Sequence, residues 1–245
     1  MQPFIEYKDI QFKYPNQVDY ALNDINFSAY EGEIITILGT SGSGKTTLIK
    51  LANKLLLPIS GAIYLKGQNI AEIDTGQLRR RMGYVIQQAG LFPHLTVKEN
   101  IDIVARLNKE VVDDKRLIEL LELTKLPLDK AFQNRRPWQL SGGQQQRVGL
   151  ARALYCGPEI LLMDEPFGAL DAITRYELQQ EFLGLHQQTK TTALFVTHDL
   201  REALMLGDRV MVLRDGEIQQ LATPEELVQN PANDYVRLLL QIGQG

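Results

Sequence analysis

The stretch Gly39-Thr40-Ser41-Gly42-Ser43-Gly44-Lys45-Thr46 lies between an apolar run, Ile34–Leu38, and a helix-like segment that begins at Thr47. This order predicts a strand, a glycine-rich loop and a helix, the context in which the pattern G-x-x-x-x-G-K-[ST] binds phosphate. Glycines let successive backbone N–H groups point inward at phosphate oxygens, and the N-terminal end of the helix adds positive potential. We therefore expect the eight residues and Thr47 to bind a nucleotide, with Lys45 reaching its β- and γ-phosphates and the Thr46 hydroxyl binding Mg²⁺.

The whole chain has the composition of an ordinary globular protein. Its 245 residues fit one large α/β domain or two small ones, and 44% of them are apolar and 23% charged. The net charge of −4 gives no signature of nucleic-acid binding, and Arg79–Arg81 is expected to be a solvated helix face. The single cysteine, Cys156, excludes an intramolecular disulfide. No apolar run has the length of a signal peptide or a bilayer span, so a cytoplasmic protein is expected, and any membrane role must come from a partner.

The first third of the chain predicts a mixed β arrangement. Phe4–Tyr14 and Leu22–Tyr30 have the alternation of strands, and a turn at Pro58–Gly61 precedes a short strand at Ala62–Leu65. This opening is expected to combine an antiparallel layer with the parallel sheet that contains Ile34–Leu38.

The rest of the chain predicts a helical insertion between two β/α parts. Strands are expected at Met82–Gln87, Ile160–Met163, Ala193–Val196 and Val210–Leu213. From residue 97 to about 132 the pattern is helical, with Leu117, Leu120 and Leu121 on the buried face and Asp113, Lys115, Glu119 and Glu122 facing away. We expect a single α/β domain over 1–245, with a core at about 1–90 and 152–245 and a helical subdomain at about 91–151.

Two carboxylates follow the buried strand Ile160–Met163. Asp164 and Glu165 should emerge at the carboxyl end of the sheet, where open α/β folds bind ligands. Asp164 can hold Mg²⁺ through water. Glu165 is placed to orient and polarise the attacking water as a general base.

A second anion-binding helix start is predicted at Leu140-Ser141-Gly142-Gly143-Gln144, since two glycines after a serine open a helical segment. A local helix cap is the alternative. This five-residue match, followed by Gln145-Gln146-Arg147-Val148 and later by Asp164-Glu165, resembles the ATP-binding subunits of ABC transporters over essentially the whole chain. The resemblance implies a P-loop NTPase (RecA-like) core with an N-terminal antiparallel β layer and an inserted α-helical subdomain. It also assigns Ser141, Gly142, Gly143 and Gln144 to ATP binding.

Tyr14 and Gln87 are similar to two further residues of the family. Tyr14 resembles the aromatic residue that stacks on adenine, and an ordinary strand residue is its alternative. Gln87 resembles the glutamine that contacts Mg²⁺ and shifts when the membrane partner moves. The spacing to Leu91-Phe92-Pro93 favours Gln87 over the neighbouring Gln88.

Asp171 and His198 also match the family pattern. Asp171, in Gly168-Ala169-Leu170-Asp171, resembles the residue that links two ATP sites across a dimer, and a helix N-cap is its local alternative. His198 resembles the histidine that contacts the γ-phosphate and steadies the attacking water. His94 and His186 match nothing catalytic and are expected at the surface.

The resemblance implies an ATPase that forms a head-to-tail homodimer around two ATP molecules, with Mg²⁺, and powers transmembrane permease subunits. Such a subunit would lie on the inner face of the cell membrane. We expect its membrane partner to dock a short helix into a groove bordered by residues 87–94 and the helical arm, because Leu91-Phe92 predicts an exposed apolar patch; a locally buried loop is the alternative. Residues 87–96 and the tail at 222–236 are most similar to importers of glycine betaine, choline and related osmoprotectants, which also use a solute-binding protein. The alternatives are an importer of another small solute, such as an amino acid or oxyanion, and a non-transport ABC ATPase. A kinase with the same loop would leave Ser141–Gln144 unexplained.

Overall fold

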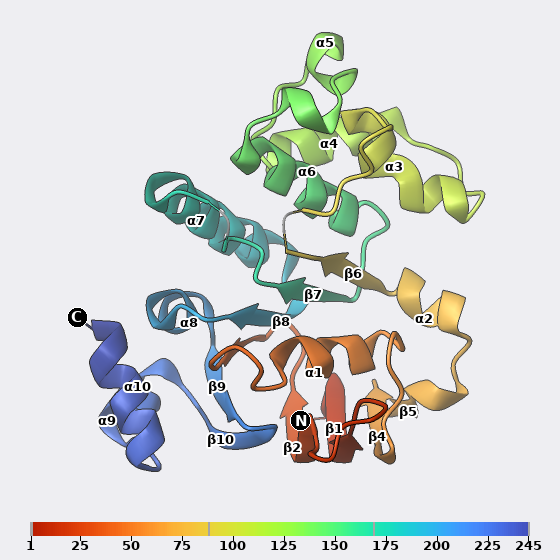
Figure 1. Cartoon of the computed structure of the whole chain (residues 1–245). Coiled ribbons are helices and arrows are strands. Elements are labelled where there is room, and N and C mark those ends of the chain that lie inside the picture. Colours follow the sequence, from red (N-terminus) through yellow and green to blue (C-terminus); the bar gives the residue numbers. More distant parts are fainter. Residues whose placement is uncertain (1, 88, 169, 245) are drawn as a thin grey trace. The chain divides into compact units, whose positions relative to one another are not determined.

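The computed structural model describes residues 2–87, 89–168 and 170–244, coloured along the chain in Figure 1. Its contacts divide the chain into two compact units. The first unit contains Met1–Arg79, Leu162–Asp164 and Lys190–Gly245, and the second contains Arg80–Leu161 and Glu165–Thr189. The predicted boundaries of the helical subdomain, about 91–151, stay a prediction.

The first unit begins with a four-stranded antiparallel sheet in the order β2-β1-β4-β5. Its strands are β1 (Ile5–Phe12), β2 (Leu22–Ala29), β4 (Ser60–Leu65) and β5 (Gln68–Asn69). The predicted antiparallel layer is confirmed, but β1 stops at Phe12 and does not reach Tyr14. Pro15 has no N–H to donate, and the chain turns directly after Tyr14. β4 begins at Ser60 rather than at Ala62, because Ser60 already pairs with β1.

A second sheet of the same unit carries the phosphate loop. Its order is β10 (Glu217–Ala222), β9 (Arg209–Arg214), β3 (Ile34–Leu38), β8 (Thr192–Thr197) and the end of β7 (Ile160–Asp164). β3 is buried over its whole length and runs parallel to β8 and β9, so that Leu38 is level with Thr197 and Val212. The carboxyl ends of these strands therefore meet at one edge of the sheet. β10 pairs antiparallel with β9. Its sequence, EIQQLA, is half polar, and no strand was predicted there.

Helices of the first unit pack on these sheets. They are α1 (Lys45–Ala52), η1 (Ile70–Glu72), α2 (Thr75–Arg80, which ends at the unit boundary), α8 (Leu200–Leu206), α9 (Pro224–Gln229) and α10 (Asp234–Gln244). The hydroxyl of Tyr7 on β1 donates to the Leu48 carbonyl at 3.0 Å and so joins the antiparallel layer to α1. Leu227 of α9 and Val236 of α10 belong to one buried cluster with Val212 of β9, and the two helices lie together at the blue end of the chain (Figure 1).

The second unit is mostly helical. It contains β6 (Met82–Val85), the start of β7, α3 (Val97–Leu107), α4 (Asp114–Leu123), α5 (Lys130–Gln133), η2 (Pro137–Gln139), α6 (Gly142–Leu154) and α7 (Ala172–Thr189). Helices α3 to α6 form one group in Figure 1. Leu117, Leu120 and Leu121 are buried as predicted, and the four polar residues predicted to face away are exposed.

Two predictions about single residues are wrong. β6 ends at Val85, so Gln87 lies in the loop after the strand. The solvated face predicted at Arg79–Arg81 is confirmed for Arg79 and Arg80, which are exposed, although Arg79 also donates to the carbonyls of Asn53 and Lys54, each at 3.0 Å. Arg81 is half-buried and forms two bonds with the Glu159 carboxylate. His94 is exposed as predicted, but His186 is buried, because it shares the inner face of α7 with Phe182.

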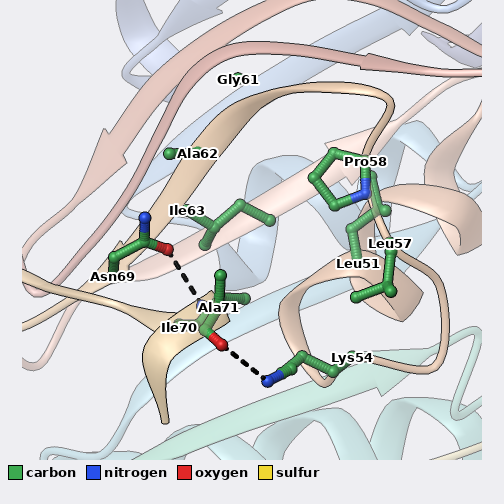
Figure 2. A pocket seen from close by; sticks show the side chains of 10 residues that line it. All are labelled: Leu51, Lys54, Leu57, Pro58, Gly61, Ala62, Ile63, Asn69, Ile70 and Ala71. Atoms are coloured by element: carbon green, nitrogen blue, oxygen red, sulfur yellow. Dashed lines mark hydrogen bonds between the residues drawn. The ribbon is translucent and has the colours of Figure 1, made fainter.

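A small apolar pocket of about 70 Å³ lies in the first unit, between the end of α1, β4 and η1 (Figure 2). Its polar groups bond to nearby backbone. The Lys54 ammonium donates to the carbonyls of Ala71 at 3.3 Å and Ile73 at 2.9 Å, and Asn69 Oδ1 accepts from the Ala71 N–H at 3.0 Å. No residue of the phosphate loop lines this pocket.

Within the residues that the structure describes, none of the helices combines the length and the apolar character needed to span a bilayer.

Candidate functional site

The phosphate loop, Gly39–Thr46, joins the buried strand β3 to α1. Gly42 and Gly44 have φ values of 83° and 104°, a left-handed conformation that glycine adopts without strain. Lys45 is buried, and its ammonium donates to the carbonyls of Gly39 at 2.7 Å and Thr40 at 2.9 Å. The Lys45 ammonium therefore bonds to the backbone of its own phosphate loop.

The loop has the groups that a nucleotide phosphate requires. Ser43 Oγ is buried and has no hydrogen-bond partner among the described residues, although a buried hydroxyl normally has one. Next to it, the first turn of α1 presents backbone N–H groups without intrahelical partners. With the Lys45 ammonium, these donors fit the β- and γ-phosphates of ATP.

Two oxygens suited to Mg²⁺ lie together in the same unit. Thr46 Oγ1 donates to Asp164 Oδ1 at 2.9 Å, at the start of α1 and the end of β7. In the part of the chain that the structure describes, no cluster of three or more His, Cys, Asp or Glu side chains could hold a metal ion. Mg²⁺ commonly binds through one or two protein oxygens together with phosphate oxygens and water, which this pair fits.

Tyr14 lies beyond β1 and beside the start of α1. Its hydroxyl and Thr47 Oγ1 are 2.9 Å apart, and its ring packs edge-on against Phe12 with 4.9 Å between ring centroids. The ordinary strand alternative for Tyr14 is therefore wrong. An aromatic ring next to the phosphate loop is placed to contact the base of a nucleotide whose phosphates occupy that loop.

His198 is exposed at the carboxyl edge of the second sheet. It directly follows Thr197, and Thr197 is level with Leu38, the residue before Gly39. The histidine and the phosphate loop thus leave the sheet at the same edge.

The second unit contains the signature residues, Ser141–Gln144, at the start of α6. Ser141 Oγ accepts from the Gln144 N–H at 3.2 Å, and Gln144 Oε1 accepts from the Ser141 N–H at 3.1 Å. This reciprocal pair is a capping box, so the local cap alternative is confirmed. Ser141 and Gly142 are nevertheless exposed, and a Cβ on Gly143 would lie 2.7 Å from Thr174 Cγ2. Gly143 therefore lets the start of α6 lie close to α7, while Ser141 and Gly142 stay accessible to solvent.

Gln87 and Glu165 contact each other in the second unit. Gln87 Nε2 donates to Glu165 Oε2 at 3.4 Å, although the two residues lie on different loops. Glu165 has a φ of 46°, a left-handed conformation that costs free energy for a residue with a side chain. Such strain is typical of functional sites, and here it occurs at the predicted general base, directly after Asp164.

Asp171 caps α7. Its Oδ1 accepts from the Thr174 N–H at 3.0 Å, and this backbone hydrogen bond holds the pKa of the Asp171 carboxyl below its usual value. The N-cap alternative is therefore confirmed, and the predicted role across a dimer stays a prediction. Ala169 of the same motif and Gln88 lie outside the described residues.

Two polar residues that support the site gave no prediction from the sequence. Asn100 is fully buried on α3, where its amide bonds to the backbone of Phe92 and to two carbonyls of residues 95–96. Arg152 on α6 bonds to the backbone of residues 89–90. The sequence could have indicated Asn100, because it is a polar residue on the same helical face as the apolar residues Val97 and Ile101. No such pattern surrounds Arg152.

A family model described as "ABC transporter" matches residues 22–168. The chain belongs to the ABC transporter family.

Curated relatives support this assignment. The glycine betaine/carnitine/choline transport ATP-binding protein of Bacillus subtilis (strain 168) is 50% identical over 217 residues, which are 88% of this chain and 57% of that protein. The glycine betaine uptake system ATP-binding protein of Escherichia coli (strain K12) is 48% identical over 219 residues, 89% of this chain and 70% of that protein. The chain spans little more than half the length of several of these relatives.

Solved structures share the fold. An ATP-binding cassette solved as a dimer in a post-hydrolysis state with ADP and Pi has a TM-score of 0.79 and 34% identity, covering 90% of this chain and 98% of that chain. A component of an ABC transporter complex from Clostridium perfringens has a TM-score of 0.84 and 26% identity, covering 100% of this chain and 98% of that chain. The predicted α/β fold with a P-loop NTPase core is confirmed.

Proposed function

We propose that this chain is the ATP-hydrolysing subunit of an ABC importer whose solute is an osmoprotectant such as glycine betaine or choline. The observation that carries the proposal is the 2.9 Å contact between Thr46, at the end of the phosphate loop, and Asp164, which Glu165 follows directly. Nucleotide and cation would thus meet at one edge of the sheet of the first unit, and the proposed general base is the next residue in the chain. Membership of the ABC transporter family supports the transport role, and the similarity to glycine betaine, carnitine and choline transport ATP-binding proteins supports the solute class.

Each residue has a defined part in this proposal. The Lys45 ammonium exchanges its bonds to the Gly39 and Thr40 carbonyls for phosphate oxygens. Thr46 and Asp164 hold Mg²⁺, which neutralises phosphate charge when bound.

The hydrolytic step belongs to residues on three other loops. Glu165 accepts a proton from the attacking water, His198 steadies that water and the γ-phosphate, and Gln87 contacts Mg²⁺ through its neutral amide. The contact between Gln87 and Glu165 supports a shared site for these two residues. Tyr14 stacks on the adenine.

A second copy of the chain completes the site. The phosphate loop already surrounds the phosphates of the ATP that its own subunit binds. The helix start at Ser141–Gln144 is therefore assigned to ATP bound by the other subunit. In a head-to-tail pair with two-fold symmetry the same surfaces build two equivalent sites, which Asp171 would link. The dimeric cassette among the similar structures supports this arrangement. In this proposal the dimer binds transmembrane permease subunits at the inner face of the membrane. A solute-binding protein delivers the solute to the permease.

The variant Glu165→Gln tests the catalytic part. It keeps the size of the side chain but cannot accept a proton, so ATP turnover should fall by about 10²–10⁴-fold while ATP still binds. A dimer should then accumulate with ATP and not with ADP, measured by light scattering. Glu177→Gln, at an exposed position on α7, is the matched control and should behave as wild type. Unchanged turnover in Glu165→Gln, or a dimer equally populated with ADP, would contradict the proposal.

The solute needs a separate experiment. The chain is purified with its native membrane partner, and the associated solute-binding protein is titrated with quaternary amines, amino acids and oxyanions. Selective binding of an amino acid or an oxyanion would replace the osmoprotectant assignment and leave the ATPase assignment intact.

A further inference from the structure

Helix α6 has the signature residues at its start and a two-pronged contact near its end. Arg152 Nη1 donates to the Gly90 carbonyl and Arg152 Nη2 to the Ala89 carbonyl, each at 2.8 Å. The planar guanidinium holds the two carbonyls in a rigid fork, whereas an ammonium can bond to two carbonyls, as Lys45 does, without fixing their directions. The contact lies two to three residues after Gln87, in the loop that follows β6.

The backbone that Arg152 holds is strained and tightly packed. Ala89 and Gly90 have φ values of 59° and 51°, and Ala89 is only 1% exposed. A left-handed alanine costs about 1–2 kcal/mol, so this conformation needs support from its surroundings. Gly149, one turn before Arg152, gives that support from the helix backbone: a Cβ there would lie 3.2 Å from the Ala89 carbonyl oxygen.

Among the described residues, the Arg152 guanidinium contacts only this loop. Burial lowers the pKa of its guanidinium, and its contacts are the two carbonyls and the Phe92 ring, whose centroid lies 6.0 Å from the guanidinium carbon. By contrast, Arg147 on the same helix forms an ordinary two-bond pair with the Glu181 carboxylate, at 3.0 Å for each bond. A cation that gives up water for main-chain carbonyls fixes their positions.

The following residues are held from a second helix. Asn100 Oδ1 accepts from the Phe92 N–H at 2.8 Å, and Asn100 Nδ2 donates to the carbonyls of Phe92, Leu95 and Thr96 at 3.0–3.1 Å. The segment 89–96 is thus fixed at both ends, by α6 and by α3. Phe92, whose backbone bonds to Asn100 and whose ring lies near Arg152, remains 42% exposed.

We infer that Arg152 is a positioning residue that makes the loop after Gln87 and the signature residues move as one body with α6. The inference rests on the proposed function, in which Gln87 and Ser141–Gln144 both contact ATP. From Ser141 to Arg152 the helix is about 16 Å long and rigid. A partner that displaces Phe92 would therefore shift the signature residues, instead of only bending the loop.

Four variants test the inference in the purified full-length chain. Arg152→Gln removes the fork, and Arg152→Lys keeps the charge without the rigid fork. Gly149→Ala keeps Arg152 but presses on Ala89. Arg147→Gln is the matched control, because it removes a two-bond arginine from the same helix without touching residues 89–96.

The variants of Arg152 should lower kcat and leave the affinity for ATP almost unchanged. Misplacing reacting groups by about 1 Å costs up to about 100-fold in rate, so Arg152→Gln should lower kcat by about 10–100-fold, and Arg152→Lys by less. The dissociation constant for ATP, measured with a fluorescent analogue, should stay within about twofold, because the phosphate loop belongs to the first unit. Arg147→Gln should keep kcat within about twofold.

Gly149→Ala separates a loss of kcat from a loss of folding stability. Alanine favours a helix over glycine by about 1 kcal/mol, which offsets part of the cost of the contact with Ala89, so the urea midpoint of this variant should change little while kcat falls. General destabilisation would lower both quantities. An unchanged kcat in Gly149→Ala and in folded Arg152→Gln, or an equal loss in Arg147→Gln, would overturn the inference.

Hydrogen exchange read by mass spectrometry gives a result that does not depend on hydrolysis. Arg152→Gln should raise exchange in peptides covering 86–96 and 141–146 together, and Arg147→Gln should leave 86–96 unchanged. Unchanged exchange at 86–96 in Arg152→Gln would overturn the inference. A wild-type chain that bound ATP but never hydrolysed it, alone or with its membrane partner, would refute the proposed function instead.

Discussion

Replacing Gly39 by alanine should damage the phosphate loop through a steric clash alone. A Cβ at this position would lie 2.3 Å from the Leu213 carbonyl oxygen and 2.6 Å from Ser43 Oγ. Ordinary contacts begin at about 3.4 Å, so the overlap with the carbonyl is about 1 Å. Leu213 belongs to β9, and the neighbouring Val212 is paired with Leu38, so the carbonyl cannot move without disturbing the sheet.

The cost of this overlap should appear in stability and in ATP binding. Overpacking of this kind typically costs about 1–3 kcal/mol, and the loop, which is less constrained than β9, should give way first. A loop displaced by about 1 Å misplaces its N–H donors. Since each 1.4 kcal/mol is a factor of ten, we expect the dissociation constant for ATP to rise by about 10–100-fold.

The assay compares Gly39→Ala with Gly184→Ala. Gly184 lies within α7 and has no atom within 4 Å of an added Cβ, so its replacement should raise the urea midpoint, by about 0.5–1 kcal/mol in stability. Circular dichroism follows unfolding, and calorimetry measures ATP binding with Mg²⁺. A Gly39→Ala variant with wild-type unfolding and wild-type ATP affinity would refute the argument, because the contact with Leu213 would then impose no constraint.

Three shorter predictions concern other parts of the chain. Tyr14→Ala should weaken ATP binding by about 1–3 kcal/mol, whereas Tyr14→Phe loses only the hydroxyl contact to Thr47 and should bind nearly as wild type; equal losses would remove the ring from the base site. Trp138 is the single tryptophan and is 64% exposed just before the signature residues. If dimerisation buries it, ATP but not ADP should shift its fluorescence emission to shorter wavelengths in Glu165→Gln; no shift on dimerisation would place Trp138 outside the interface. The Glu99 carboxylate accepts the Thr96 N–H, which lowers the pKa of Glu99, so its contribution to stability is present above the unfolded pKa and is lost as the pH falls through the folded one. Glu99→Gln should therefore flatten the fall in urea midpoint between about pH 6 and pH 3; an unchanged slope would contradict this.

The local features of this protein were predictable from the sequence. The phosphate loop, its strand Ile34–Leu38 and the cap at Ser141 depend on residues close together in the chain, so backbone geometry and hydrogen bonding within a few residues suffice to specify them. The apolar face of α4 was predictable for the same reason, because a period of 3.6 residues shows directly which side is buried.

Tertiary structure decided the features that depend on distant partners. His186 is buried because of the direction in which α7 faces, and Arg79 caps carbonyls 25–26 residues away, contacts that no local pattern contains. β10 forms although half of its six residues are polar, since β9 offers an edge to pair with. The strained Ala89 likewise depends on Arg152, which is 63 residues away in the chain. Local sequence specifies an element through its own backbone, whereas burial, pairing and strain depend on groups that only folding brings together.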